Sequence, residues 1–213
     1  MGMNQKELDW ALFECLPGGP WGVDGLEKAS DFLGLGANPS RPSHDRGTHA
    51  ITESALGRAA KMGHEPMVEL MLSSPLAEPN RQSINQKLPI SEAISGGFVE
   101  IVRLLAPRTR LSFELSRWGR GEALPSPLGL AILRGRTQCF MAMIEAISSE
   151  ELAKDLDDML SWTTKIVGDA DNAGVRDPKR DEILRWIEAQ VERRDLAASL
   201  GPESRGAKSP RAL

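Results

Sequence analysis

The sequence predicts an all-α solenoid, a stack of about four to five short helix pairs closed by divergent terminal caps. In GRAAKMGHEPMVELML, residues 57–72, one apolar stripe ends at a Gly-His pair and a second stripe starts out of phase with it. The arrangement returns twice, because Leu56, Ile90 and Leu128 hold equivalent places 34 and then 38 residues apart. Such self-similarity at a period of about 20–50 residues is typical of stacked repeat units.

Each unit is expected to be two antiparallel helices joined at a glycine. Gly63 is a poor residue for a helix interior and a common helix stop, and Pro66 suits the first turn of a second helix. The extra residues of the longer period fall between helix pairs, where insertions cost little. Small side chains in the first stripe allow neighbouring helices to approach closely, so we expect four buried alanines: Ala59, Ala60, Ala93 and Ala131.

These segments resemble the ankyrin repeat, in which T-P-L-H-x-A-A precedes Gly-His, V-V-x-L-L-L and then G-A-D-x-N. ESALGRAAKMGHEPMVELML, residues 53–72, is the best match, and residues 126–128 correspond to the T-P-L start. Residues 36–39, GANP, are similar to the end of an earlier repeat. The chain departs from the family where the family has histidine, at Gly57, Ser91 and Gly129.

The resemblance implies one ankyrin-repeat domain over residues 1–199. Its repeats are expected at residues 7–40, 53–80, 87–115 and 125–148. Residues 150–199 are expected to form a divergent helical cap, with helices at about 150–167 and 179–198, because terminal repeats are commonly atypical. Residues 200–213 are rich in Gly, Pro and Ser, which predicts a disordered tail.

Composition excludes several classes of partner. The 213 residues are 40% apolar with a formal charge of -4, which indicates neither a nucleic-acid nor a membrane partner. No stretch approaches the roughly 18 apolar residues of a membrane span, and no signal peptide is visible, so we expect a soluble cytoplasmic monomer. Cys15 and Cys139 belong to no Cys/His cluster and are expected to be reduced core thiols.

Candidate catalytic and metal-binding residues are few, and for each we favour a structural interpretation. His64 occupies the Gly-His junction, where the resemblance implies a structural role. His44 and His49 lack the third ligand of a metal site. GDADNAG, residues 168–174, lacks the bidentate Glu of a calcium loop, so we expect a turn between helices. The sequence therefore predicts no catalytic residue, cofactor or metal.

The tryptophans divide into two groups. Trp10, Trp162 and Trp186 have apolar neighbours at helical spacing, which predicts core positions. Trp21 and Trp118 lie in Gly-bracketed irregular segments. For those two, packing and partner binding both remain open, because aromatic residues dominate interfaces as well as cores.

Charge is unevenly distributed and suggests a binding surface. Residues 41–49, 81–87 and 108–122 together carry +5 in a chain of net charge -4. If repeat geometry aligns these inter-repeat fingers, they form a basic lip for an acidic patch on a partner; solvated loops are the equal alternative. The candidate partner-binding residues are Arg46, Arg81, Lys87, Arg110, Arg117, Trp118 and Arg120 in the fingers, and Arg58, Lys61, Glu92 and Arg134 on first helices.

The resemblance implies non-enzymatic protein recognition, and three hypotheses follow. The chain is an immunity protein or inhibitor of a toxin, an adaptor or host-directed effector, or an unrecognised enzyme built on the insertions. Gene neighbourhood separates the first two, because an immunity protein is normally encoded beside its toxin.

Overall fold

The computed structural model describes residues 3–44, 51–83, 87–111, 116–117, 123–124 and 126–199. The predicted disordered tail, 200–213, lies outside these residues. The described part contains ten α-helices: α1 (Gln5–Glu14), α2 (Gly25–Gly34), α3 (Ala55–Met62), α4 (Glu65–Leu72), α5 (Pro89–Gly96), α6 (Val99–Leu105), α7 (Pro127–Leu133), α8 (Thr137–Ile144), α9 (Ser149–Asn172) and α10 (Pro178–Ser199). Short 3-10 turns precede α2 (η1, Gly22–Asp24) and follow α6 (η2, Ala106–Arg108).

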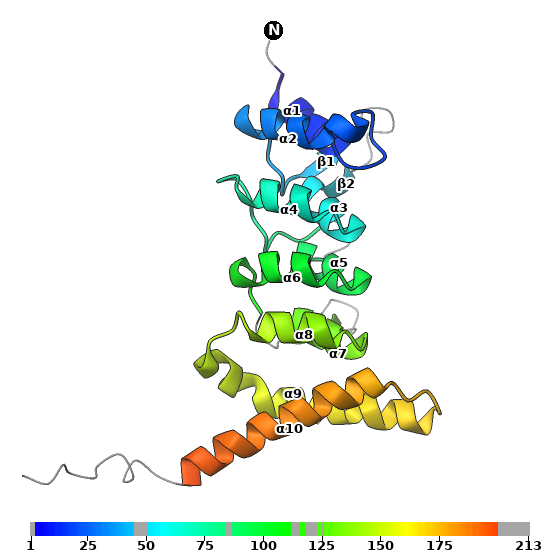
Figure 1. The fold of residues 1–213 in the computed structure, drawn as a ribbon, viewed down its shortest axis with the longest axis vertical. Helices are drawn as coiled ribbons and strands as arrows, with labels where there is room; N and C mark the ends of the chain where they lie inside the picture. The colour runs from blue at the N-terminus through cyan, green and yellow to red at the C-terminus, as the bar shows by residue number, and fades with distance from the viewer. Residues whose placement is uncertain are drawn as a thin grey trace, which may run out of the picture.

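The helices stack as antiparallel pairs in chain order, from α1–α2 at the N-terminal end to α9–α10 at the other (Figure 1). First helices pack on first helices and second helices on second, as in the α3–α5 and α4–α6 contacts. None of the described helices is both long and apolar enough to cross a membrane. The all-α solenoid that the sequence predicts is confirmed.

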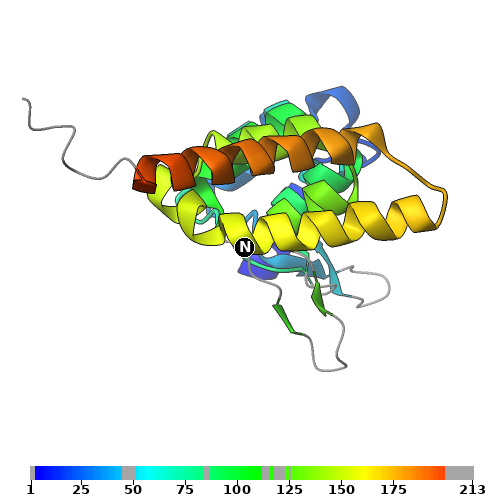
Figure 2. The same ribbon diagram turned by 90° about the horizontal axis from the view of Figure 1, so that it is seen from below.

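Two β-hairpins lie in the connections between helix pairs. Strand β1 (Pro42–His44) pairs antiparallel with β2 (Ile51–Ser54), and β3 (Ser116–Arg117) pairs antiparallel with β4 (Ala123–Leu124). Seen along the stack, β3 and β4 project beyond the first helices on the α9 side (Figure 2). The inter-repeat insertions thus add two short strand pairs to an otherwise helical fold.

The helix boundaries follow from local chemistry. Gly63, Gly97 and Gly135 end the first helices or lie just after them with φ values of 75°, 78° and 60°, a left-handed conformation that glycine adopts without strain. At the start of α3 the hydroxyl of Ser54 accepts from the Gly57 amide at 3.1 Å, and Ser126 plays the same part in α7. These stops and caps fix where each turn of the stack occurs.

Each glycine turn is covered by a side chain from the next unit. The Phe98 ring packs against Gly63, where a Cβ would come within 2.6 Å of it. The guanidinium of Arg136 lies over Gly97 and donates to the Ser95 carbonyl at 3.0 Å. Asp177, from the connection before α10, covers Gly135 in the same way. The next unit can therefore pack against each turn only because the turn residue is glycine and has no side chain.

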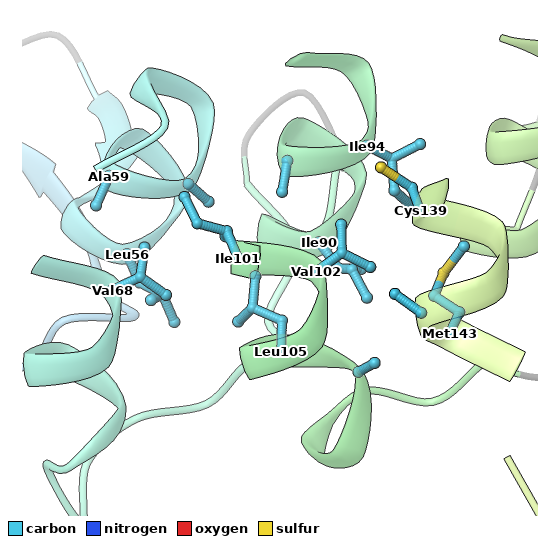
Figure 3. Close-up of a cluster of buried hydrophobic side chains, with 14 of the residues drawn as sticks. Leu56, Ala59, Val68, Ile90, Ile94, Ile101, Val102, Leu105, Cys139 and Met143 are labelled. Atoms are coloured by element: carbon cyan, nitrogen blue, oxygen red, sulfur yellow. The ribbon is translucent and has the colours of Figure 1, made fainter. Parts of the chain in front are cut away.

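Small and branched side chains fill the space between pairs (Figure 3). Ala59, Ala60, Ala93 and Ala131 are all fully buried, as predicted. From the second helices, Ile101 points back toward Leu56 and Cys139 toward Ile94, so each pair inserts a side chain into the preceding one. The result is one continuous apolar core along the stack.

The last two helices close the stack with their apolar sides. Leu156, Met159 and Thr163 of α9 and Ile183 and Ile187 of α10 are buried. The Phe140 and Trp186 rings meet edge to face at 5.5 Å, which joins α8 to α10. Both guanidinium amines of Arg194 donate to Asp157 at 2.8 Å, which ties α10 to α9 on the solvent side.

One predicted boundary is wrong. Residues 168–172 were expected in a turn, but α9 continues through them and ends at Asn172. Gly168 is helical, with no other atoms within 4 Å of a Cβ there, whereas Gly174 has a φ of 69° and makes the turn. Either Gly168 or Gly174 could have ended the helix. The helix continues past Gly168 because an isolated glycine in a helix interior costs only about 1 kcal/mol.

Gly97→Ala should lower the free energy of unfolding. An L residue at φ 78° is strained by about 1–2 kcal/mol, and the new Cβ would lie 3.2 Å from Arg136 Nη1. Gly168→Ala is the matched control and should have the opposite sign, a gain of about 0.5–1 kcal/mol in a helix interior. Urea unfolding followed by circular dichroism measures both, and stabilisation by Gly97→Ala would contradict this account of the turn.

Ala93→Leu should destabilise the stack by about 1–3 kcal/mol, because Ala93 is fully buried on α5, which packs between α3 and α7. Ser161→Leu introduces the same side chain at an exposed site on α9 and should change stability by less than about 0.5 kcal/mol. Equal thermal unfolding midpoints for the two variants would show that the α3–α5–α7 contact is not closely packed.

Candidate protein-binding surface

Equivalent positions of the first four first helices form one surface, which we call the first-helix face. The buried alanines Ala11, Ala59, Ala93 and Ala131 set the register between α1, α3, α5 and α7. The positions one before and two after each alanine border that contact, and most of them are half-buried or exposed. The first-helix face therefore consists of Trp10, Phe13, Arg58, Lys61, Glu92, Ser95, Leu130 and Leu133.

Two aromatic rings and a guanidinium form its N-terminal part. Trp10 stacks on Phe13 with ring centroids 5.5 Å apart and planes 20° apart, and both side chains are half-buried. The guanidinium carbon of Arg58 lies 5.4 Å from the Phe13 ring centroid, within cation–π range. The predicted core position of Trp10 is thus wrong, because it lies off the stripe of Leu8, Ala11 and Leu12 that α1 buries.

Trp162 and Trp186 do pack against the core, half-buried, as expected. Trp21 is 37% exposed and meets Phe32 at 6.2 Å between centroids, so it combines packing with an accessible edge. Trp118 lies outside the described residues.

Lys61 and Glu92 occupy the centre of the first-helix face. Lys61 Nζ lies 2.8 Å from Glu53 Oε1, and this hydrogen bond raises the pKa of Lys61. Glu92 was predicted as an exposed binding residue, but it is only 8% exposed and its carboxylate lies 3.4 Å from Lys87 Nζ. Lys87 lies two residues before the start of α5 and neutralises Glu92, so this carboxylate stabilises the fold and is not available to a partner.

The other candidate residues are spread over the fingers and helix ends. Arg81 pairs with Glu78 at 3.3 Å, Arg134 is exposed at the end of α7, and the exposed Arg110 is held by its backbone amide, which donates to Asn80 Oδ1 at 2.7 Å. Arg117 contributes its backbone to β3. Arg46, Trp118 and Arg120 lie outside the described residues, so the basic lip stays a prediction.

The second helices present the opposite charge. Six exposed carboxylates lie on these helices or at their ends, Glu27, Asp31, Glu65, Glu69, Glu100 and Glu145. Arg103 lies among them and forms a short hydrogen bond with Glu145 and an ion pair with Glu100 at 3.7 Å. Basic and aromatic groups on one side and acidic groups on the other give the stack two chemically distinct long faces.

A family model described as ankyrin repeats (many copies) matches residues 56–106, which span α3 to the start of η2. Residues 56–106 are thus similar to ankyrin repeats over two of the stacked helix pairs. A search of curated proteins gave no match. Ankyrin repeats are protein–protein interaction modules and generally non-enzymatic scaffolds, so the first-helix face is a candidate surface for a protein partner.

The histidines that could serve catalysis or metal binding contribute to local structure instead. His64 Nδ1 accepts from the Met67 amide at 3.2 Å and so caps α4, as expected. His44 contributes backbone to β1, and His49 lies outside the described residues. In the described ranges, no three or more His, Cys, Asp or Glu side chains group as a metal site would require.

The two cysteines are free and buried, as predicted. Burial raises the pKa of the Cys15 thiol to about 12, and its Sγ donates to the Ala11 carbonyl at 3.2 Å. Burial also raises the pKa of Cys139. A thiol that resists ionisation is a poor nucleophile, so both act as apolar core residues of the repeats.

Cys15 should make stability fall at alkaline pH. Its folded pKa is raised, so above pH 9 the unfolded chain ionises the thiol while the folded chain does not, and the unfolded state gains stability. By pH 10 the contribution is about 1 kcal/mol. Urea unfolding of wild type and Cys15→Ala from pH 7.5 to 10 should show the steeper loss in wild type. Parallel pH profiles would mean that the thiol is accessible in the folded state.

Proposed function

We propose that this chain binds one partner protein through the first-helix face and the adjoining fingers, and acts by occupying that partner rather than by chemistry. The observation that carries the proposal is the cluster of Trp10, Phe13 and Arg58. Phe13 packs against the edge of the core, and half-buried Trp10 and exposed Arg58 stack on its ring. Tryptophan and arginine are the residues most enriched at interface hot spots.

The proposal extends to the fingers. Lys87 pairs with Glu92 of α5, and Arg81 and Arg110 lie in the connections that follow α4 and α6. Arg46, Trp118 and Arg120 belong to the inter-repeat fingers by sequence. Exposed basic groups around a binding face accelerate encounter with an acidic partner more than they add affinity. We therefore assign the basic side chains of the fingers to steering, and the first-helix face together with Trp118 to affinity.

We further propose that the partner is a toxin that the chain neutralises, as an immunity protein does. An inhibitor needs a single extended face, whereas an adaptor needs two separate ones. The stacked aromatic and cationic side chains gathered on the first-helix face favour the inhibitor. An adaptor or host-directed effector remains the alternative function.

The product of the neighbouring gene should bind this chain, and calorimetric titration of the two purified proteins tests it. Arg58→Glu/Lys61→Glu reverses the charge of the first-helix face and should weaken binding at least 100-fold, about 3 kcal/mol. Lys165→Glu/Arg193→Glu makes the same change in net charge on α9 and α10 and should stay within threefold of wild type. Trp118→Ala should cost about 2 kcal/mol if the fingers contribute.

Co-expression separates the two functions. An immunity protein should restore growth of cells that express the neighbour, and the Arg58→Glu/Lys61→Glu variant should fail to do so at equal abundance. A partner that binds without any change in its own activity would favour the adaptor. Equal affinity of both double variants would place the binding surface elsewhere.

A further inference from the structure

We propose that the first-helix face binds an extended acidic segment of its partner, with an apolar side chain at each end and a carboxylate between them. The inference rests on the proposed function and adds the chemistry of the partner. It follows from the order in which the four first helices present their side chains along the stack.

The first position is aromatic. Trp10 and Phe13 form a half-buried pair on α1, and Arg58 lies against the Phe13 ring. The accessible parts of the rings suit an apolar or aromatic side chain, since stacked and edge contacts add to the burial of area. This end of the face supplies the first anchor.

The second position is basic. Arg58 is exposed, and none of the described carboxylates pairs with it, so its contact with Phe13 orients the guanidinium without neutralising it. Lys61 forms an ion pair with Glu53, and Lys87 forms one with Glu92. Among these described residues the positive charge of Arg58 is therefore not balanced. A planar guanidinium with free N–H groups favours a carboxylate that accepts two hydrogen bonds.

The third position is small and the fourth is apolar. On α5 Glu92 is buried and the half-buried Ser95 presents a short side chain, whose hydroxyl donates to the Ser91 carbonyl at 2.9 Å. On α7 Leu130 is half-buried and Leu133 is 38% exposed. A partner backbone can approach α5 closely, and an apolar side chain beyond it can cover the two leucines.

Helix spacing converts this order into a sequence pattern. The guanidinium carbon of Arg58 lies 5.4 Å from the Phe13 ring centroid, and packed helices lie about 8–10 Å apart, so the two leucines of α7, two helices beyond α3, lie about 20 Å further. An extended chain rises about 3.3 Å per residue. The carboxylate should therefore follow the first apolar residue by about two positions and precede the second by about six, in one chain direction or the other.

Selection from a phage-displayed library of random 12-residue peptides, with the whole chain as bait, tests the pattern. Enriched peptides should carry an acidic residue about two positions from one apolar residue and about six from another. Arg58→Glu/Lys61→Glu should weaken the synthetic peptides at least 30-fold, and selection on that variant should enrich Lys or Arg at the same place. Leu133→Ser should weaken them about fivefold, and Lys165→Glu/Arg193→Glu less than twofold.

Failure of this inference is distinguishable from failure of the proposed function. Peptides without a central acid, peptides insensitive to reversal of Arg58 and Lys61, or no enrichment at all would overturn the acidic segment. If the neighbouring gene product still loses affinity with the Arg58→Glu/Lys61→Glu variant, the first-helix face stands as the binding surface and only the partner chemistry is wrong. Circular dichroism of every variant should match wild type.

Discussion

The close approach of one helix pair to the next at a glycine turn is the contact on which the stack depends. Helices of seven or eight residues, such as α3 to α8, are too short to persist in water without tertiary packing. They form because buried alanines let α3, α5 and α7 lie together, and because Phe98 and Arg136 cover the glycine of the preceding turn. Each unit is therefore stable only in contact with its neighbours, which is the physical basis of a solenoid.

Packing through a single stripe of small side chains leaves a large part of each first helix outside the core. Burial occupies one stripe of a helix, and the positions beside the central alanine are constrained only by solubility or by a partner. In three of the repeats those positions hold Trp10, Arg58 and Leu130, three different chemistries on one scaffold, whereas Glu92 at the fourth is buried. A side chain that serves the stack, such as Glu92 with Lys87, is recognised by its burial and its ion pair.

The sequence predicted the features that repeat and missed those that occur once. Recurrence of the Gly63, Gly97 and Gly135 pattern located every turn between paired helices from α3 to α8, and the four alanines are buried because one physical requirement acts on each copy. Trp10 was predicted in the core because apolar neighbours at helical spacing do not separate the edge of the buried stripe of α1 from its centre. Glu92 was predicted to be exposed because the sequence pattern does not report its ion pair with Lys87. The hairpins were missed since their strands of two to four residues lie in insertions without a repeat.

Rigid spacing matters as much as side-chain chemistry for recognition. The residues of the first-helix face come from four helices whose separations are fixed by the core, so they do not have to be ordered when a partner binds. Arg58 shows the same effect at the level of one side chain, because its stacking on Phe13 restricts a guanidinium that would otherwise lose rotamer freedom on binding. Ordering a long side chain at an interface costs about 0.5–1.5 kcal/mol, and groups already held in place avoid most of that cost. The aromatic ring beneath Arg58 thus has two consequences: it offers apolar surface, and it holds in position a positive charge that none of the described carboxylates pairs with.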